Sequence, residues 1–221
     1  MAAGPHTPPA VEPSLREAVL TLARGYDFEE GHALQDERLA LRLFDELLRL
    51  GLLDLAPVPQ LPSTSSPGPP AGPITARAVL SCAALLHDIG YVEGYEQHHK
   101  TAFRLILAAT IPGLSSRIQA LAAHVARYHR GSKPDPVAHG AFGRLSDDDQ
   151  RLVMQLGAIL RFADGLDRSH TDAVQDLSCQ LDGSRLRVTL QPGVGDEAER
   201  WAGQKKARWF EAVFGVRVIL T

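Results

Sequence analysis

The sequence predicts a mainly α-helical protein that ends in a small α+β segment. Apolar residues recur every three to four positions through most of the first 170 residues, which is the period of amphipathic helices. After that point the period changes to two, and an Asp-Gly pair separates two short alternating runs, as in a β-hairpin. We therefore expect a helical domain over 13–170, a small α+β domain over 171–221 and a disordered N-terminus over 1–12.

The first half of the chain predicts three helices and one connector. Apolar spacing on one face predicts helices over 13–23 and 29–50, and Gly51 ends the second. The proline-, serine- and glycine-rich stretch 56–73 can neither continue a helix nor bury an apolar face, so it predicts a flexible loop within the helical domain. A nearly all-apolar run then predicts a deeply buried helix over 74–87.

The second half predicts further helices and the α+β tail. Apolar patterns predict helices at 99–110, 115–128 and 147–166. A loop over 129–146 precedes the last of these, and Ser146 with Asp149 predicts a capping box at its start. In the tail, two strands flank Asp182-Gly183, and a helix over 196–214 leads to a final strand, which gives the order ββαβ.

Composition excludes some classes of partner. The formal net charge of -3, from 23 Lys+Arg and 26 Asp+Glu, gives no overall basic field and does not favour nucleic acid. No run approaches the roughly 20 apolar residues that a membrane helix needs. The N-terminus also lacks a charged start followed by an apolar segment, so it does not resemble a secretory signal. We expect a cytoplasmic protein without a membrane partner, and a homodimer stays open.

Histidines and aspartates interrupt the apolar helices or mark their ends. Imidazole nitrogen and carboxylate oxygen together suit manganese, iron, cobalt, nickel or zinc. Asp88 at a helix C-terminus and Asp164 inside an apolar helix are unfavourable unless paired, and a cation would relieve both. The candidate metal ligands are His32, His87, Asp88, His99, His129 and Asp164.

The adjacency of His87 and Asp88 suggests a site with two ions. Consecutive residues on a regular helix point about 100° apart and rarely serve one ion, whereas at a fraying helix end they can. Asp88 can then bridge, which leaves His32, His87 and Asp164 on one metal and His99 with His129 on a second. For His99 and His129, packing against the bundle end or contact with substrate phosphate are the alternatives.

Basic side chains flank these candidate ligands along the sequence. Such charges usually form a solvated surface, but near a divalent ion they suit a phosphate ester with several negative charges. The candidate phosphate contacts are Lys100, Arg130, Lys133, Arg161 and Arg168. The nearby tyrosines, Tyr91, Tyr95 and Tyr128, either stack on a base or cover the rim of the core.

Several motifs carry a family resemblance. "HDIG", with an upstream histidine and a downstream "RFADGLDRSH", resembles the HD-domain metal-dependent phosphohydrolase superfamily, in which a His, a His-Asp pair and a final Asp ligate the metal. "YDFEEGHALQDERLALRLFDEL", "IPGLSS" and "ARYHRGSKP" are similar to the C-terminal HD-like domain of the exopolyphosphatase and guanosine pentaphosphatase (Ppx/GppA) family, from about Leu15 onward. This resemblance implies an HD-type helical bundle. The ATPase-like domain that normally precedes it in the family is not in this sequence, so we expect a free-standing domain with an active metal site.

These patterns predict a divalent-metal-dependent phosphohydrolase. It would act on a nucleotide or related small phosphorylated metabolite through a metal-activated water, with His87 and Asp88 as catalytic residues and one or two ions bound. Manganese is the first expectation, with iron, cobalt, nickel, zinc or magnesium as alternatives. Family kinship adds guanosine tetraphosphate, polyphosphate and cyclic dinucleotides as candidate substrates. The alternatives are a non-catalytic module that binds polyphosphate or an alarmone, and a scaffold with a structural metal.

Overall fold

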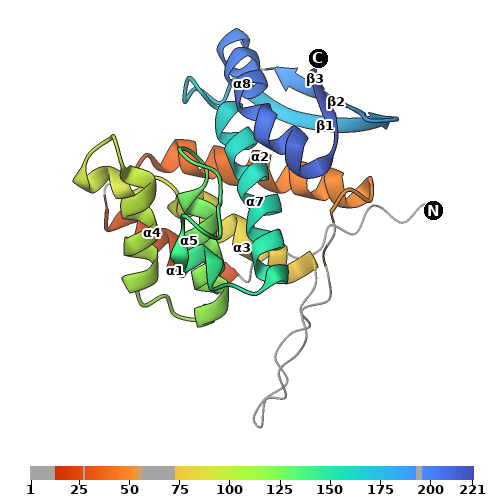
Figure 1. The fold of residues 1–221 in the computed structure, drawn as a ribbon. Coiled ribbons are helices and arrows are strands. Elements are labelled where there is room, and N and C mark those ends of the chain that lie inside the picture. The colour runs from red at the N-terminus through yellow and green to blue at the C-terminus, as the bar shows by residue number, and fades with distance from the viewer. Residues whose placement is uncertain (1–12, 27, 54, 56–72, 193–195) are drawn as a thin grey trace, which may run out of the picture.

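The chain forms a bundle of helices with a three-stranded sheet and its helix at one end (Figure 1). The computed structural model describes residues 13–26, 28–53, 55, 73–192 and 196–221. The predicted disordered N-terminus and nearly all of the predicted loop 56–73 lie outside these residues. The prediction of a mainly α-helical protein with a small C-terminal α+β segment is confirmed.

The helices follow the apolar periodicity of the sequence to within one or two residues. Phe142, inside the predicted loop, is buried and anchors a helix too short for a periodic signal. The elements are α1 (Pro13–Arg24), α2 (Glu30–Arg49), α3 (Pro73–Leu86), the 3-10 helix η1 (Ile89–Glu93), α4 (His98–Ala108), α5 (Ser116–Arg127), α6 (Gly140–Gly143) and α7 (Asp147–Gly165).

Serine caps fix where two of the helices begin. Ser115 Oγ accepts a hydrogen bond from the Ile118 amide at 3.3 Å, and Ser146 Oγ accepts one from the Asp149 amide at 3.2 Å. The reciprocal half of the predicted capping box does not form, because the Asp149 carboxylate accepts a hydrogen bond from Arg117 at 2.6 Å. Asp149 therefore ties the start of α7 to α5 instead of capping its own helix.

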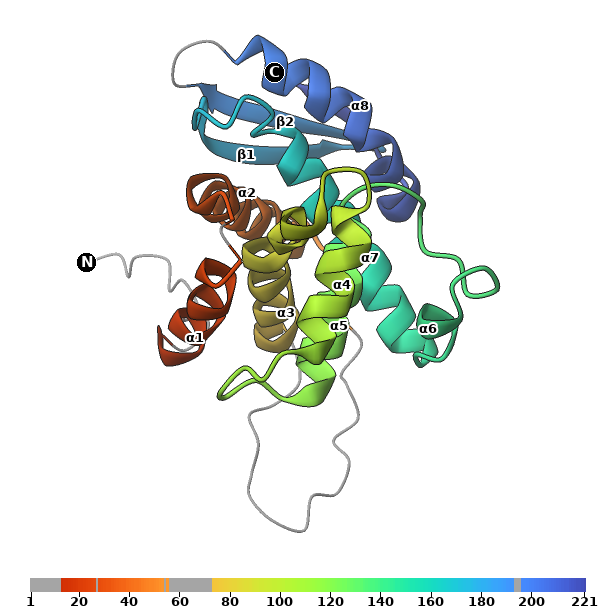
Figure 2. The same ribbon diagram turned by 90° about the vertical axis from the view of Figure 1, so that its left-hand side faces the viewer.

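The C-terminal elements have the predicted order ββαβ. Strand β1 (Val174–Asp182) pairs antiparallel with β2 (Arg185–Pro192), and Gly183 takes a φ of +58° in the turn between them. Helix α8 (Glu197–Phe214) then leads to β3 (Arg217–Leu220), which pairs parallel with β2. The sheet lies between α8 on one face and α2 on the other (Figure 2).

Helix α8 packs closely along the end of α7. A Cβ on Gly165 would lie 3.1 Å from Gly203 Cα and 3.0 Å from Lys206 Cδ. One hydrophobic cluster contains Leu39 of the bundle as well as Phe210 of α8, so apolar packing continues across the predicted boundary at 170/171. Among the described residues, no helix is long and apolar enough to cross a membrane.

Gly90 allows the chain leaving α3 to pass against the start of α4. A Cβ at this position would lie 2.0 Å from His98 O and 2.7 Å from the Ala102 nitrogen, so no other residue fits without moving the backbone. Because Asp88 lies two residues earlier, this close approach also brings its carboxylate beside His98.

Candidate metal centre

His87 and Asp88 lie at the point where α3 gives way to the 3-10 helix η1. Asp88 has φ -106° and ψ 2°, outside regular α-helix geometry, and it occupies the N-cap position of η1. This break lets two consecutive side chains face the same interior, with His87 Nε2 at 3.3 Å from Asp88 Oδ2. The predicted geometry at a fraying helix end is therefore present.

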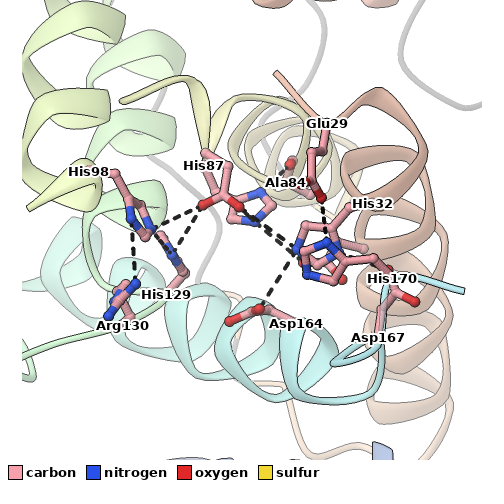
Figure 3. A network of polar contacts seen from close by, with 12 residues as sticks. Glu29, His32, Ala84, His87, His98, His129, Arg130, Asp164, Asp167 and His170 are labelled. Carbon is pink, nitrogen blue, oxygen red and sulfur yellow. Dashed lines mark hydrogen bonds and ion pairs between the residues drawn. The ribbon is translucent and has the colours of Figure 1, made fainter. Parts of the chain in front are cut away.

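Four buried imidazoles are held in the same orientation. Each donates its Nδ1 hydrogen to a fixed oxygen away from the cluster, which leaves Nε2 pointing inward, the usual arrangement of metal-binding histidines. The four bonds run from His32 to Asp167 Oδ2 (2.7 Å), His87 to Ala84 O (2.7 Å), His98 to Tyr95 O (2.8 Å) and His129 to Ala126 O (2.7 Å). Figure 3 shows His98 and His129 on one side of His87 and His32 on the other.

The first group of possible ligands contains one residue that the sequence analysis did not select. His32, Asp36, His87 and Asp164 each offer a donor atom within 4.8 Å of the others. His32 Nε2 lies 3.6 Å from Asp36 Oδ2 and 3.9 Å from Asp164 Oδ1, and His87 Nε2 lies 3.5 Å from Asp36 Oδ2. Donors about 2.0–2.2 Å from one ion lie roughly 3–3.5 Å apart, so small adjustments would close this group around a cation.

The second group lies on the other side of the Asp88 carboxylate. His87, Asp88 and His129 also offer donors within 4.8 Å of one another. Asp88 Oδ1 lies 3.5 Å from His129 Nε2 and 3.1 Å from His98 Nε2. Since Asp88 Oδ2 lies nearer His87 and is 3.8 Å from His32 Nε2, the two oxygens of Asp88 face different groups. A carboxylate in this position could be shared between two ions.

Several buried polar atoms in the cluster have no hydrogen-bond partner among the residues that the structure describes. They are Asp36 Oδ1, Asp36 Oδ2, His87 Nε2, Asp88 Oδ1 and Asp167 Oδ1. The Asp36 carboxylate is fully buried and neither of its oxygens accepts a hydrogen bond from the described residues, which lowers the stability of the fold. Ligation of a cation would offset this loss. The donor types and their spacing therefore fit a divalent transition metal.

The structure places His98, rather than His99, beside Asp88 and His129. Neither residue belongs to the two groups, but His98 Nε2 lies 3.1 Å from Asp88 Oδ1, whereas the His99 ring packs edge-on to those of His98 and His129 at centroid distances of 6.0 and 6.4 Å. The sequence analysis selected His99 as a histidine at the start of the predicted helix 99–110. In the structure, His98 begins the inward face that continues through Ala102 and Ile106.

Asp36 and Asp167 are further members of the cluster that the sequence analysis missed. Asp36 follows His32 by four residues on α2, which places both on one face of the helix, so this spacing was a readable signal. Asp167 follows Asp164 by three residues, just past the end of α7. Its carboxylate accepts the Nδ1 hydrogen of His32 and so orients that ring. Both side chains are wholly buried.

His170 covers the outer face of His32. The two rings stack with their centroids 3.8 Å apart and their planes inclined by 8°, and Nδ1 of His170 contacts the carboxylate of Glu29. His170 has a φ of +56°, a left-handed conformation that is uncommon for residues other than glycine. The segment after α7 thus folds back over the ligand group, an arrangement with no periodic signal in the sequence.

The carboxylates and imidazoles strongly shift one another's pKa. Burial alone would lower the pKa of His87, but the carboxylates of Asp88 and Asp36 outweigh it and raise that pKa to about 10. Against the effect of its own burial, Asp88 has a pKa well below its usual range because of His87. Burial, with the positive charge of His87, lowers the pKa of His129 well below its usual value, so His129 is neutral near pH 7.

We expect metal binding to release protons and to strengthen as the pH rises. Without metal, His87 is protonated near neutral pH because its pKa is about 10, and it must lose that proton before Nε2 can act as a ligand. Calorimetric titration with Mn²⁺ in HEPES and in Tris should report at least about one proton released per ion. Apparent affinity should rise at least about tenfold per pH unit between pH 6.5 and 8.5, whereas a pH-independent affinity would exclude His87 as a ligand.

A pocket of about 770 Å³ opens above the cluster. His32, Asp88 and Asp164 lie in its wall with the predicted phosphate contacts Arg130, Lys133, Arg161 and Arg168. Lys100, also predicted as a phosphate contact, is exposed on α4 and is not part of this wall. The pocket therefore collects four of the five predicted cations next to the candidate ligands.

Helix α8 adds cations that the sequence analysis did not connect with the site. Lys205, Lys206 and Arg208 also line the pocket. Lys206 Nζ contacts Asp164 Oδ2, while Asp164 Oδ1 faces His32. Burial would raise the pKa of Asp164, but the positive charges around it, Lys206 first, lower it to about 2. Lys206 thus keeps Asp164 ionised and holds one of its oxygens toward the cluster.

Fold and site together define a mainly helical protein with a buried histidine and aspartate cluster that could hold metal. In a comparison with models of protein families, the model of Ppx/GppA phosphatase, domain III, matches residues 16–198. The chain belongs to this family. No curated protein matches it. Residues 199–221 lie beyond the matched region, so most of α8 falls outside it.

Proposed function

We propose that the chain is a divalent-metal-dependent phosphohydrolase that acts on a nucleotide or related small phosphorylated metabolite. One observation carries the proposal: two groups of imidazole and carboxylate donors that share His87 lie at the floor of a cationic pocket. Membership of a phosphatase family supports the same class of reaction.

We base the role of each ligand on the donor set. In this proposal His32, Asp36, His87 and Asp164 would hold one ion, and Asp88 with His98 and His129 would hold a second. Mixed nitrogen and oxygen donors favour manganese, with iron, cobalt, nickel, zinc or magnesium as alternatives. A divalent cation here would supply Lewis-acid chemistry, which activates water and neutralises charge on a phosphoryl group.

The cations of the pocket bind and orient the phosphate. Arg161 is fixed by donating a hydrogen bond from Nη2 to Gly131 O at 2.7 Å, and its guanidinium lies 5.7 Å from the centre of the Trp209 ring. Its buried Nη1 has no hydrogen-bond partner among the described residues, so it remains available to a ligand oxygen. Arg130 is positioned over Tyr95 at 4.8 Å. Prearranged donors of this kind stabilise charge that develops on phosphate oxygens.

We expect phosphate release from at least one member of a substrate panel, dependent on both metal and His87. The panel contains nucleotides, alarmones and inorganic polyphosphate, each with Mn²⁺, Co²⁺, Ni²⁺ or Mg²⁺. His87→Ala should reduce turnover by more than about a hundredfold, because it removes a donor common to both groups. His139→Ala is the matched control, since His139 lies outside both groups and does not line the pocket.

The same panel separates the enzyme from a regulatory binding module. Binding of polyphosphate or an alarmone without turnover under any metal would favour the non-catalytic module and overturn the proposal. Turnover that survives His87→Ala would place the chemistry elsewhere and would also overturn it.

A further inference from the structure

Helix α8 places an exposed tryptophan on the wall of the pocket. Trp201 lines the pocket with 66 % of its surface exposed, and among the described aromatic side chains it is the most exposed. Exposure of a large aromatic ring is unfavourable in water, so a ring inside a ligand pocket indicates a contact surface. Trp201 also lies beyond the region matched by the family model.

The ring of Trp201 is held from one side by a cation. Lys205 Nζ lies 5.0 Å from the ring centre, which fixes the indole by a cation–π contact. A planar ligand ring can stack on the rest of the indole surface, since aromatic stacking needs only a flat partner. The buried tryptophan of the same helix, Trp209, contrasts with it, because only 4 % of its surface is exposed.

The charge of the pocket indicates which charged groups the ligand carries in addition to its planar ring. Seven cations line the wall against three carboxylates, Glu29, Asp88 and Asp164. This excess of positive charge exists before any divalent ion is added, so a single phosphate ester would not balance it. A ligand with two or three phosphate groups and an aromatic ring satisfies the cations and Trp201 together.

We propose that Trp201 is a specificity-determining residue that stacks on the base of a nucleoside di- or triphosphate whose phosphates lie toward the metal centre. This inference rests on the proposed function, because it assigns the direction of the substrate in the same pocket. It separates a nucleotide from an inorganic phosphate chain: both engage the cations, but only the nucleotide has a ring for Trp201.

Fluorescence tests this subsite without relying on turnover. The chain has two tryptophans, so a variant lacking Trp201 retains only the signal of Trp209. We expect imido analogues of adenosine and guanosine triphosphate to quench wild-type emission and to lose this quenching in Trp201→Phe. Calorimetry should show the analogues binding at least about fivefold more weakly to Trp201→Ala, with Trp201→Phe close to wild type because it keeps a stacking ring.

Inorganic tripolyphosphate is the decisive control ligand. Its affinity should change by less than about twofold in Trp201→Ala, since it makes no stacking contact. Equal loss of affinity for both ligands would mean that the variant perturbs the pocket generally, and unchanged nucleotide affinity would mean no stacking; either result overturns the inference. Nucleotide binding that depends on Trp201 without hydrolysis would refute the proposed function alone. Hydrolysis that depends on His87 but not on Trp201 would refute this inference alone.

Discussion

Asp88→Ala is expected to abolish both metal binding and turnover. Oδ2 of Asp88 lies 3.3 Å from Nε2 of His87, which belongs to both groups, and Oδ1 lies 3.5 Å from His129 Nε2, so one substitution removes the carboxylate of the second group and the carboxylate contact of His87. Metal content should fall below about a tenth of the wild-type value, and turnover should fall by more than about a thousandfold, as expected when several kcal/mol of metal assistance are lost.

Elemental analysis of protein purified without chelator measures this effect. Asp148→Ala is the matched control, because Asp148 is half-exposed on α7. Its ion pair is with Arg151, which is not part of the cluster. The control should keep full metal content and activity. Full metal occupancy in Asp88→Ala would contradict the bridging role of this carboxylate.

Asp36→Asn is expected to stabilise the metal-free protein and, at the same time, to remove stabilisation by metal. Burial raises the pKa of Asp36 to about 7, even though His32 and His87 act to lower it. Because this pKa lies above the unfolded value, the folded state binds the proton more tightly, and the contribution of Asp36 to stability falls as the pH rises from about 4 to about 7. Above that range the ionised carboxylate costs a few kcal/mol, and asparagine avoids this cost.

Thermal unfolding at two pH values tests both parts of the prediction. At pH 8 in chelator, Asp36→Asn should melt several degrees above wild type, at about 2–4 °C per kcal/mol. At pH 4 the difference should largely vanish, because Asp36 is then protonated in the folded protein. Mn²⁺ at about a hundred times its Kd should stabilise wild type by about 2.7 kcal/mol through the Asp36 site, and the variant should largely lose this contribution. A variant that gains as much from Mn²⁺ as wild type would exclude Asp36 as a ligand.

Much of the fold could be predicted because most of its helices are amphipathic. The apolar rows of α2 and α7 have the helical period over many turns, and the Asp-Gly pair marks the hairpin between β1 and β2. The short α6 gave no such signal, since four residues are too few for a period. The packing of α8 over Gly165 depends on tertiary contact and cannot be read from local pattern.

The site was less predictable where two adjacent histidines were both candidate ligands. His98 and His99 begin α4 and point about 100° apart, so a small error in helix phase exchanges them. Asp36 could have been found from its spacing to His32, whereas Lys206 and Trp201 could not, because α8 is about 40 residues beyond Asp164 in the sequence. Both residues reach the pocket through the packing of α8 on α7.

Anomalous diffraction from crystals grown with Mn²⁺ tests most directly whether the cluster holds metal. The predicted result is a strong anomalous peak between His32, His87 and Asp164, about 2.0–2.3 Å from their donor atoms. A second peak should lie between Asp88 and His129. Ordered His and Asp side chains with no anomalous peak among them, at saturating Mn²⁺, would contradict the metal centre and the hydrolase proposed from it.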